Sequence, residues 1–281
     1  MKKFKFLVLA FLGLTTLKAD GFLLDVEAGA GIWWASPSGN YDSTASLSDS
    51  ADSIVSNIDT DQKLGLEDEQ TQYIWINIKH FLPVIPNVRV DMAKVGIQGS
   101  KNLSEDFYFA NQTFSSDMDV KTDMQLDQLD ISLYWSFLGK LLPLVDIDVG
   151  LGLKYFDGYT KVEGTSESET VKEQLDVELP LPYVYGRLAV DIPMTNITAD
   201  FDIKYFEFSD LINAKMVDSR LKLDAEVLTL PLVSAHLELG YRIQILEITS
   251  GGGETLIDGF DGSISNDLSG VFGGLNVRFG L

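Results

Sequence analysis

The sequence predicts an all-β protein, a transmembrane up-and-down antiparallel β-barrel of about ten strands that follows a cleaved signal peptide. Three observations support this fold class. Apolar side chains recur at every second position over most of the chain, which is the period of a β-strand. Several apolar stripes exceed the roughly five or six residues of an average globular strand and suit the roughly nine to eleven of a tilted membrane strand. The connections alternate between long acidic segments and short ones that contain proline, an asymmetry typical of membrane barrels.

The amino-terminal segment has the three parts of a secretory signal. Lys2, Lys3 and Lys5 form a basic start, residues 6–17 are apolar, and Leu17-Lys18-Ala19 provides a cleavage site. An apolar run of about twelve residues is too short to span a bilayer as a helix, for which about twenty are needed. We therefore expect residues 1–19 to be removed on export and residues 20–281 to form the barrel, with an uncleaved anchor as the alternative.

Charge and cysteine content exclude several functions. The chain has 21 basic and 42 acidic residues, and removal of the four lysines in residues 1–19 leaves 17 basic ones and a net charge of about −25. Such a surface cannot release counterions from phosphates, so nucleic acid is not expected as a partner. The absence of cysteine excludes disulfides and thiol ligands. No cofactor is expected.

The first half of the barrel is predicted from residue 21 to residue 156. Apolar residues alternate without a break from Phe22 to Trp34, and the next strands show the same period with less regularity around residues 88–99, where a bulge would fit. Pro83 and Pro143 mark short connections. The expected strands are residues 21–34, 71–81, 88–99, 122–137 and 145–156. The polar, acidic segments between them are expected to be outer loops at about residues 35–70, 100–121 and 157–179.

The second half continues this arrangement with shorter outer loops. Pro180 and Pro182 are expected to mark the start of the sixth strand, because proline is excluded from the middle of a paired strand. Pro193 and Pro231 mark short connections. The expected strands are residues 181–192, 197–208, 217–227, 234–247 and 271–281. Outer loops are expected at about residues 209–216 and 248–266, the latter rich in glycine and aspartate.

The positions of the glycines indicate which face of each strand points into the barrel. Gly29, Gly150 and Gly240 lie on the polar faces, and small residues are most useful inside a narrow barrel. We therefore predict a polar interior and a lipid-facing apolar exterior. The predicted pore-lining residues are Asp25, Glu27, Asp146, Asp148, Lys154, Asp200, Asp202, Lys204, Arg220, Lys222, Asp224, Glu226, His236, Glu238, Arg242 and Arg278. Their mixed signs predict an ion-pair network, with selection of a permeating ion or ligand as the alternative.

Metal binding and catalysis are not required by the pattern. Neighbouring acids on one face can bind a divalent cation or act as an acid/base pair, but the spacing demands neither, and no metal site is predicted. These pairs are Asp25/Glu27, Asp146/Asp148 and Asp200/Asp202. No enzymatic activity is predicted either, because the only histidines are His80 and His236. Ser234, His236 and Glu238 share a strand face, yet residues two apart point the same way and are not expected to meet.

Aromatic residues and the closing strand complete the prediction. Aromatic side chains favour the membrane interface, and those expected there are Trp33, Trp34, Phe81, Trp135, Phe137 and Tyr155. The last strand carries one apolar face up to the carboxyl terminus. That face consists of Val271, Leu275, Val277, Phe279 and Leu281. An ordinary terminal strand of a soluble sheet is the alternative.

This closing strand resembles the C-terminal recognition strand of bacterial outer-membrane β-barrels, with Leu281 in place of the usual terminal aromatic residue. Together with the signal and the alternation, it makes the chain similar to the small outer-membrane β-barrel proteins of Gram-negative bacteria. The resemblance implies a place in the outer membrane, contact with lipid and lipopolysaccharide, and insertion by the barrel-assembly machinery. The predicted function is structural or that of a narrow pore for small solutes. The alternatives are binding or adhesion through the acidic outer loops and, more distantly, a membrane enzyme.

Overall fold

The computed structural model describes residues 24–46, 53–60, 63–110, 112–137, 144–208, 213–250 and 262–280. The predicted signal peptide, residues 1–19, lies outside these ranges. The described residues include no helix that could span a bilayer. The strands are β1 (Leu24–Ser46), β2 (Ser53–Asp59), β3 (Glu69–His80), β4 (Asn87–Asn102), β5 (Phe107–Phe109), β6 (Gln112–Phe114), β7 (Asp119–Phe137), β8 (Val145–Thr165), β9 (Thr170–Asp191), β10 (Ile197–Phe208), β11 (Ala214–Leu230), β12 (Val233–Ser250) and β13 (Gly262–Gly280).

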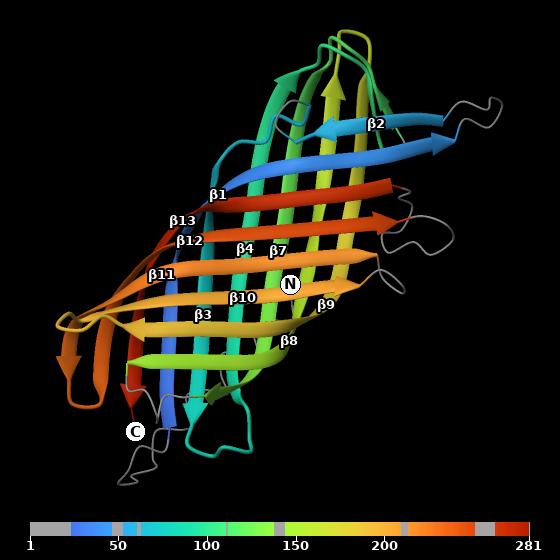
Figure 1. Ribbon diagram of the computed structural model, residues 1–281. Coiled ribbons are helices and arrows are strands. Elements are labelled where there is room, and N and C mark those ends of the chain that lie inside the picture. The colour runs from blue at the N-terminus through green and yellow to red at the C-terminus, as the bar shows by residue number, and fades with distance from the viewer. Residues whose placement is uncertain are drawn as a thin grey trace, which may run out of the picture.

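Ten of these strands form a closed antiparallel ring (Figure 1). Their order round the ring is β1, β3, β4, β7, β8, β9, β10, β11, β12 and β13, and pairing of β13 with β1 closes it. Short connections at residues 81–86, 192–196 and 231–232 lie at one end, together with the start of β1 and the end of β13. The predicted fold class and strand number are therefore confirmed. We call this end the short-turn end and the opposite one the long-loop end.

Several segments expected to be outer loops are strands. β1 continues to Ser46, β8 and β9 occupy most of residues 157–179, and β13 begins at Gly262. Pro180 and Pro182 consequently lie within β9 and not at its start. They pair with β8, whereas the pairing of β9 with β10 reaches only Val184, so neither proline interrupts that ladder. β4 keeps unbroken register with β3 and β7, so its irregular pattern is not caused by a bulge.

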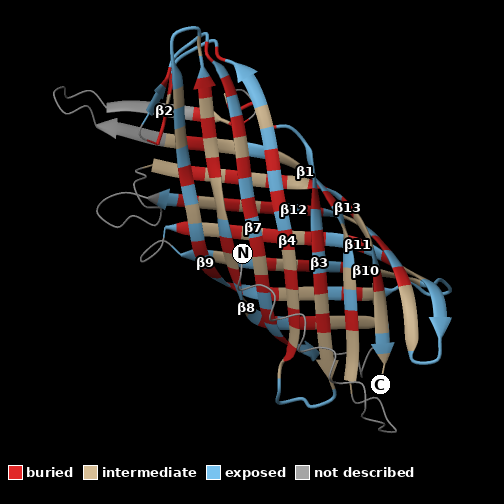
Figure 2. Ribbon diagram, turned by 180° about the vertical axis from the view of Figure 1, so that it is seen from behind, coloured by how far each residue is buried: buried red, intermediate tan, exposed pale blue. Residues whose placement is uncertain are grey.

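Long strands keep the same face buried along their length, but the apolar side chains move from the outer face to the inner face part of the way along. In β7, Leu129, Ile131 and Leu133 face outward in the half near the short turns, while Asp130 and Ser132 face inward. Beyond residue 128 toward the long loops the assignment is reversed. Lys121, Asp123, Gln125 and Asp127 face outward there, and Val120, Met124 and Leu126 are buried inside. Buried and exposed residues alternate without a break along the strand (Figure 2). It is therefore the chemistry of the two faces that inverts and not the phase of the strand.

This inversion divides the barrel into two zones. In the short-turn zone the exterior is an apolar band and the interior is charged. In the long-loop zone the exterior is polar and the interior is an apolar core. The same change explains the irregular pattern of β4, in which Val88, Val90 and Met92 face outward but Ala93, Val95 and Ile97 face inward. In the first zone the apolar side chains point outward and the polar ones inward, and in the second zone the reverse holds.

The long-loop zone resembles two packed sheets more than a round barrel. β4, β7, β8 and β9 continue as one sheet, while β11, β12, β13, β1 and β2 continue as another (Figure 1). The two sheets meet through the apolar core: the Tyr41 hydroxyl of β1 lies 3.2 Å from the Thr160 hydroxyl of β8, and the Tyr41 ring packs edge-on to Phe109. Asn266 of β13 contacts Met124 of β7. The core closes the barrel at this end.

The inner glycines make room for aromatic rings. A Cβ atom on Gly29 would lie 2.5 Å from the Trp75 indole, and one on Gly152 would lie 2.3 Å from the Tyr183 ring. Glycine on the inner face is therefore a packing requirement, because a narrow ring cannot hold both side chains.

We expect Gly152→Val to destabilise the barrel by about 1–3 kcal/mol, because the new side chain overlaps the Tyr183 ring. The matched control is Gly96→Val, since nothing lies within 4 Å of a Cβ atom at Gly96. Urea unfolding in detergent, followed by the heat-modifiable shift on a gel, measures both. Equal loss of stability in the two variants would contradict the packing argument.

Candidate functional site

A cluster of buried charges fills the interior of the short-turn zone. It includes two lysines, Lys154 and Lys204, whose side chains are completely buried. Alternation places these groups inside, because each belongs to a strand whose outward neighbours are apolar. We define the central charge cluster as Arg89, Asp91, Asp130, Lys154, Asp202, Lys204, Asp218, Arg220 and Arg242.

The cluster is held by ion pairs that cross the bore. Arg220 of β11 reaches Asp91 of β4 at 2.9 Å, and these two strands lie on opposite sides of the ten-strand ring. Lys204 bridges Asp91 and Asp130, at 3.2 Å to each carboxylate. Such pairs satisfy charges that would otherwise be costly to remove from water. They also tie opposite walls together.

A second chain of contacts runs through Asp218. This carboxylate accepts from Lys154 at 2.6 Å and from Arg242 at 2.7 and 2.9 Å. Arg242 of β12 also donates to Gln128 of β7, on the far side of the ring, at 3.3 Å. Asp218 therefore forms ion pairs with two buried cations, Lys154 and Arg242.

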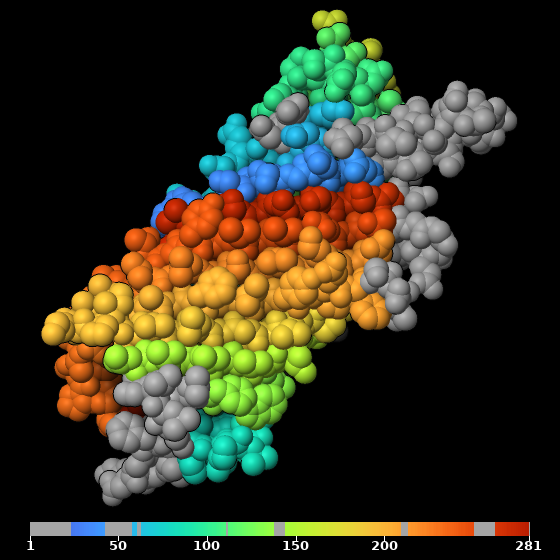
Figure 3. All heavy atoms as spheres, in the orientation of Figure 1, coloured from blue at the N-terminus to red at the C-terminus, as the bar shows by residue number. Residues whose placement is uncertain are grey.

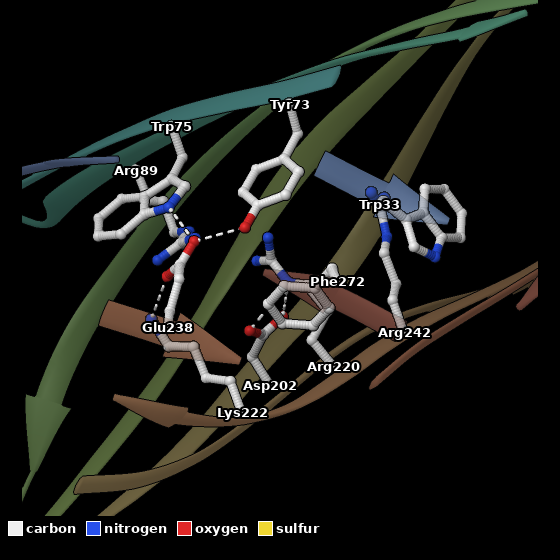
Figure 4. A pocket seen from close by; sticks show the side chains of 10 residues that line it. All are labelled: Trp33, Tyr73, Trp75, Arg89, Asp202, Arg220, Lys222, Glu238, Arg242 and Phe272. Atoms are coloured by element: carbon white, nitrogen blue, oxygen red, sulfur yellow. Dashed lines mark hydrogen bonds and ion pairs between the residues drawn. The ribbon is translucent and has the colours of Figure 1, made fainter. Parts of the chain in front are cut away.

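Aromatic rings surround these charges (Figure 4). Glu238 accepts from the Tyr73 hydroxyl at 2.7 Å and from the Trp75 indole at 3.3 Å, and it pairs with Lys222 at 3.3 Å. The Arg89 guanidinium lies over the Trp75 ring at 4.6 Å, a cation–π contact.

The bore is closed by these side chains. The internal cavity among the residues of Figure 4 has a volume of about 20 Å³, enough for about one water molecule. Adding Lys222, Arg187, Glu238, Asp148 and Asp200 to the central charge cluster gives seven cations and seven anions, and Glu27 and Asp224 are further buried carboxylates outside this set. The face of the molecule seen in Figure 3 shows β1, β13, β12, β11 and β10 packed side by side. A filled interior whose charges are paired across the ring has the properties of a structural plug.

Comparison with known proteins rests on three-dimensional structure alone. No protein-family model matches the chain, and no curated protein matches it in sequence. The crystal structure of the outer membrane protease OmpT from Escherichia coli aligns over 95% of this chain and 99% of that one, at 8% identity and a TM-score of 0.50. The chain has the fold of an outer-membrane β-barrel. The transport unit of the autotransporter AIDA-I from Escherichia coli aligns over 96% of this chain and 94% of that one, at 8% identity and a TM-score of 0.41.

Most of the predicted pore-lining side chains face the interior of this outer-membrane barrel fold. Buried there are Glu27, Asp148, Lys154, Asp200, Asp202, Lys204, Arg220, Lys222, Asp224, His236, Glu238 and Arg242. Asp25, Asp146 and Arg278 lie at the short-turn mouth, in a cavity of about 270 Å³. Glu226 lies at the rim, where it contacts Thr229. What these residues line is a filled core, and Arg187 joins Asp148 to Asp200 beside the mouth, at 2.8 and 2.7 Å.

The aromatic residues of the barrel divide differently from the prediction at one position. Trp34, Phe81, Trp135 and Phe137 are exposed on the outside, and half-buried Tyr155 contacts Glu178. Trp33 instead has no exposed surface and points inward, where the Arg242 guanidinium lies 4.5 Å from its ring. Adjacent residues of a strand must face opposite sides, so Trp33 and Trp34 cannot both reach an interface.

Several interior charges were not predicted from sequence. Arg89 and Asp91 lie on β4, whose pattern inverts, and Arg187 lies on β9, which begins at Thr170 and not at residue 181 as expected. Asp130 and Asp218 were within reach of sequence reasoning. Asp130 stands between Leu129 and Ile131, and Asp218 shares the face of Arg220 by alternation. Among the residues that the structure describes, no group of three His, Asp or Glu side chains could hold a metal ion.

A groove of about 480 Å³ lies on the exterior of the long-loop zone. Its floor comes from β4, β7 and β8, and its rim includes Glu67, Glu69, Lys121 and Lys161. Lys172 donates to Glu163 at 2.9 Å, and this hydrogen bond lowers the pKa of the Glu163 carboxyl below its ordinary value. The groove presents both charge signs to solvent.

Proposed function

We propose that the protein is an integral outer-membrane barrel with a closed bore, whose role is structural: it holds the polar, two-sheet long-loop zone above the membrane. The observation that carries this proposal is the filled interior, with a central cavity of about 20 Å³ between ion pairs that span the ring. A channel needs continuous water, and a one-water cavity cannot supply it. This function requires no catalysis.

The exterior supports insertion into a bilayer. Leu151, Leu221 and Leu239 are each about half exposed or more on the outer face of the short-turn zone, a costly arrangement in water but a favourable one in lipid. The closing strand carries Val271, Leu275, Val277 and Phe279 on its outward face, and Leu281 lies outside the described residues. Outer-membrane lipid, lipopolysaccharide and the barrel-assembly machinery are the partners that this proposal implies.

We expect the purified protein to produce no stepwise conductance in planar lipid bilayers, because the side chains that fill the bore leave no water path. Liposome swelling with small sugars or amino acids is expected to match protein-free vesicles. Folding must first be verified by heat-modifiable migration on a gel. Regular conductance steps, or swelling above the protein-free rate, would support the narrow-pore alternative and overturn the closed-bore proposal.

A second candidate function is binding at the exterior groove of the long-loop zone. The observation that favours it is the size of this groove, about 480 Å³, and its position beyond the apolar band. Lys121 and Lys161 on its rim would attract an acidic partner, whereas Glu67 and Glu69 would attract a basic one. The test compares how much of an acidic partner binds to whole cells that carry the wild type and to whole cells that carry a Lys121→Glu/Lys161→Glu variant. If the two substitutions left this binding unchanged, the groove would not be the binding site.

A further inference from the structure

Ser234, His236 and Asp224 form a continuous hydrogen-bonded relay at the short-turn end of the barrel. The Ser234 Oγ lies 2.8 Å from His236 Nε2, and His236 Nδ1 lies 2.6 Å from Asp224 Oδ1. A neutral imidazole that donates from Nδ1 to the carboxylate leaves Nε2 free to accept from the hydroxyl. These are the contacts by which an acid, a base and a nucleophile are arranged for acyl transfer.

The fold fixes all three side chains. Ser234 and His236 stand two residues apart on the inner face of β12, and Asp224 projects from the neighbouring β11. Asn276 of β13 donates to the other carboxylate oxygen of Asp224 at 2.7 Å, which orients that carboxylate toward the imidazole. Asp224 and His236 are buried, whereas Ser234 is half-buried. The sequence-based expectation that Ser234 and His236 do not meet is wrong, and the acidic partner is Asp224 in place of Glu238.

Ser234 lines a groove that lies outside the closed bore. This groove at the short-turn mouth has a volume of about 480 Å³. Leu230, Leu232 and Phe81 contribute apolar surface, and each is exposed by half or more. Ser234 thus stands at the boundary between the filled interior and an accessible, largely apolar recess. A substrate can reach its hydroxyl without crossing the central charge cluster.

A cation lies beside the serine. Arg278 of β13 is the direct strand partner of Ser234, and both line the groove. The Arg278 Nε lies 2.5 Å from Glu27, so the guanidinium is held at the mouth. A positive charge at this position would stabilise an oxyanion that forms on a carbonyl attacked by Ser234.

We propose that Ser234 is the nucleophile of a carboxylic-ester hydrolase site that accepts esters with an apolar acyl group. The Ser234 Oγ forms a bond to the ester carbonyl carbon while its proton passes to His236 Nε2. The tetrahedral intermediate then releases the alcohol, which takes that proton, and leaves an acyl-serine. Water repeats the sequence: its oxygen bonds to the acyl carbon, its proton passes through His236 Nε2 to the departing Ser234, and the carboxylic acid is released. No oxidant, metal or cofactor takes part.

The first test uses the folded wild-type barrel in detergent micelles. We expect it to hydrolyse p-nitrophenyl butyrate and to be labelled by a fluorophosphonate probe, with the label on Ser234 in the peptide mass spectrum. Labelling at one serine would not follow if the relay only satisfied a buried histidine. A protein that migrates as a folded barrel yet shows neither hydrolysis nor a label at Ser234 would overturn the proposal.

Substitutions then separate chemistry from folding. We expect Ser234→Ala to abolish labelling and to lower hydrolysis on the order of 10³-fold or more, with Asp224→Asn lower by a similar order. Ser132→Ala is the matched control, because Ser132 is also an inward-facing strand serine but contacts the Tyr183 hydroxyl, at 2.8 Å. It is expected to keep wild-type hydrolysis. If Ser234→Ala retained wild-type hydrolysis, or if Ser132→Ala lost labelling while folded, Ser234 would not be the nucleophile.

Discussion

Replacing Asp218 by Ala is expected to lower the free energy of unfolding by about 3–5 kcal/mol, the cost of removing one partner from a buried ion pair. Asp218 is 1% exposed and accepts from both Lys154 and Arg242. Without it, the fully buried Lys154 keeps the Asp130 carboxylate, at 3.1 Å, and a cation–π contact with the Phe156 ring. Urea unfolding in lipid vesicles, followed by tryptophan fluorescence, measures the loss.

The matched control for this change is an ion pair on the outer surface. Lys172 pairs with Glu163 at 2.9 Å, but its side chain is 55% exposed. Lys172→Ala is therefore expected to cost about 0–1 kcal/mol, because solvent screens the pair. If Asp218→Ala cost no more than Lys172→Ala, the interior charges would be solvated, and a water-filled bore would replace the closed one.

Replacing Leu151 by Arg is expected to destabilise the inserted barrel by about 2–4 kcal/mol, because the new charge would face lipid near the middle of the apolar band. Leu151 lies on the outward face of β8 and is 63% exposed. In a water-soluble protein, the same substitution at so exposed a position would change stability little. The size of the effect therefore reports the surrounding medium.

Gln125→Arg provides the control on the neighbouring strand. Gln125 also faces outward and is exposed, but it lies in the long-loop zone, between Asp123 and Asp127. The Gln125→Arg substitution is expected to change the free energy of unfolding by less than about 0.5 kcal/mol. Both variants are compared by urea unfolding in the same lipid vesicles. Equal effects at the two positions would mean that no boundary separates the zones.

The ring of strands and the charged inner face can be predicted from the sequence because both depend on a local signal. The two-residue period of β8 or β12 fixes which side chains share a face, and glycines such as Gly152 identify the crowded one. The same local signal recovers Lys154 and Arg242 as interior residues. Pairing across the ring is not local, so the partners of these residues were not predictable.

The long-loop zone was missed for a physical reason. A hydrophobic stripe predicts a buried or lipid-facing side, but the stripe in β7 changes from outside to inside beyond Leu129. Each half then looks like a separate, weaker pattern, and the polar outer face of the long-loop zone has the composition of a loop. Trp33 was misplaced in the same region, because its neighbour Trp34 does face outward.

The Ser234 relay shows the limit of reading one strand at a time. His236 and Ser234 are two residues apart, and their spacing alone gives no contact. The third member, Asp224, comes from β11, where it pairs directly with Glu238 and lies diagonally across from His236. A bulge between Glu226 and Leu228 then shifts the register beside Ser234. A one-residue irregularity of this kind cannot be located from composition or period.

Site-directed spin labelling along β7 tests the two-zone account most directly. Single nitroxides at positions 121, 123, 125, 127, 129, 131, 133 and 135 all face outward, so any change along the series reports the medium outside the barrel. In lipid vesicles we expect labels at 129–135 to collide mainly with oxygen, which partitions into lipid, and labels at 121–127 mainly with a water-soluble nickel chelate. The change should fall between 127 and 129. A uniform response along the whole series would contradict the account.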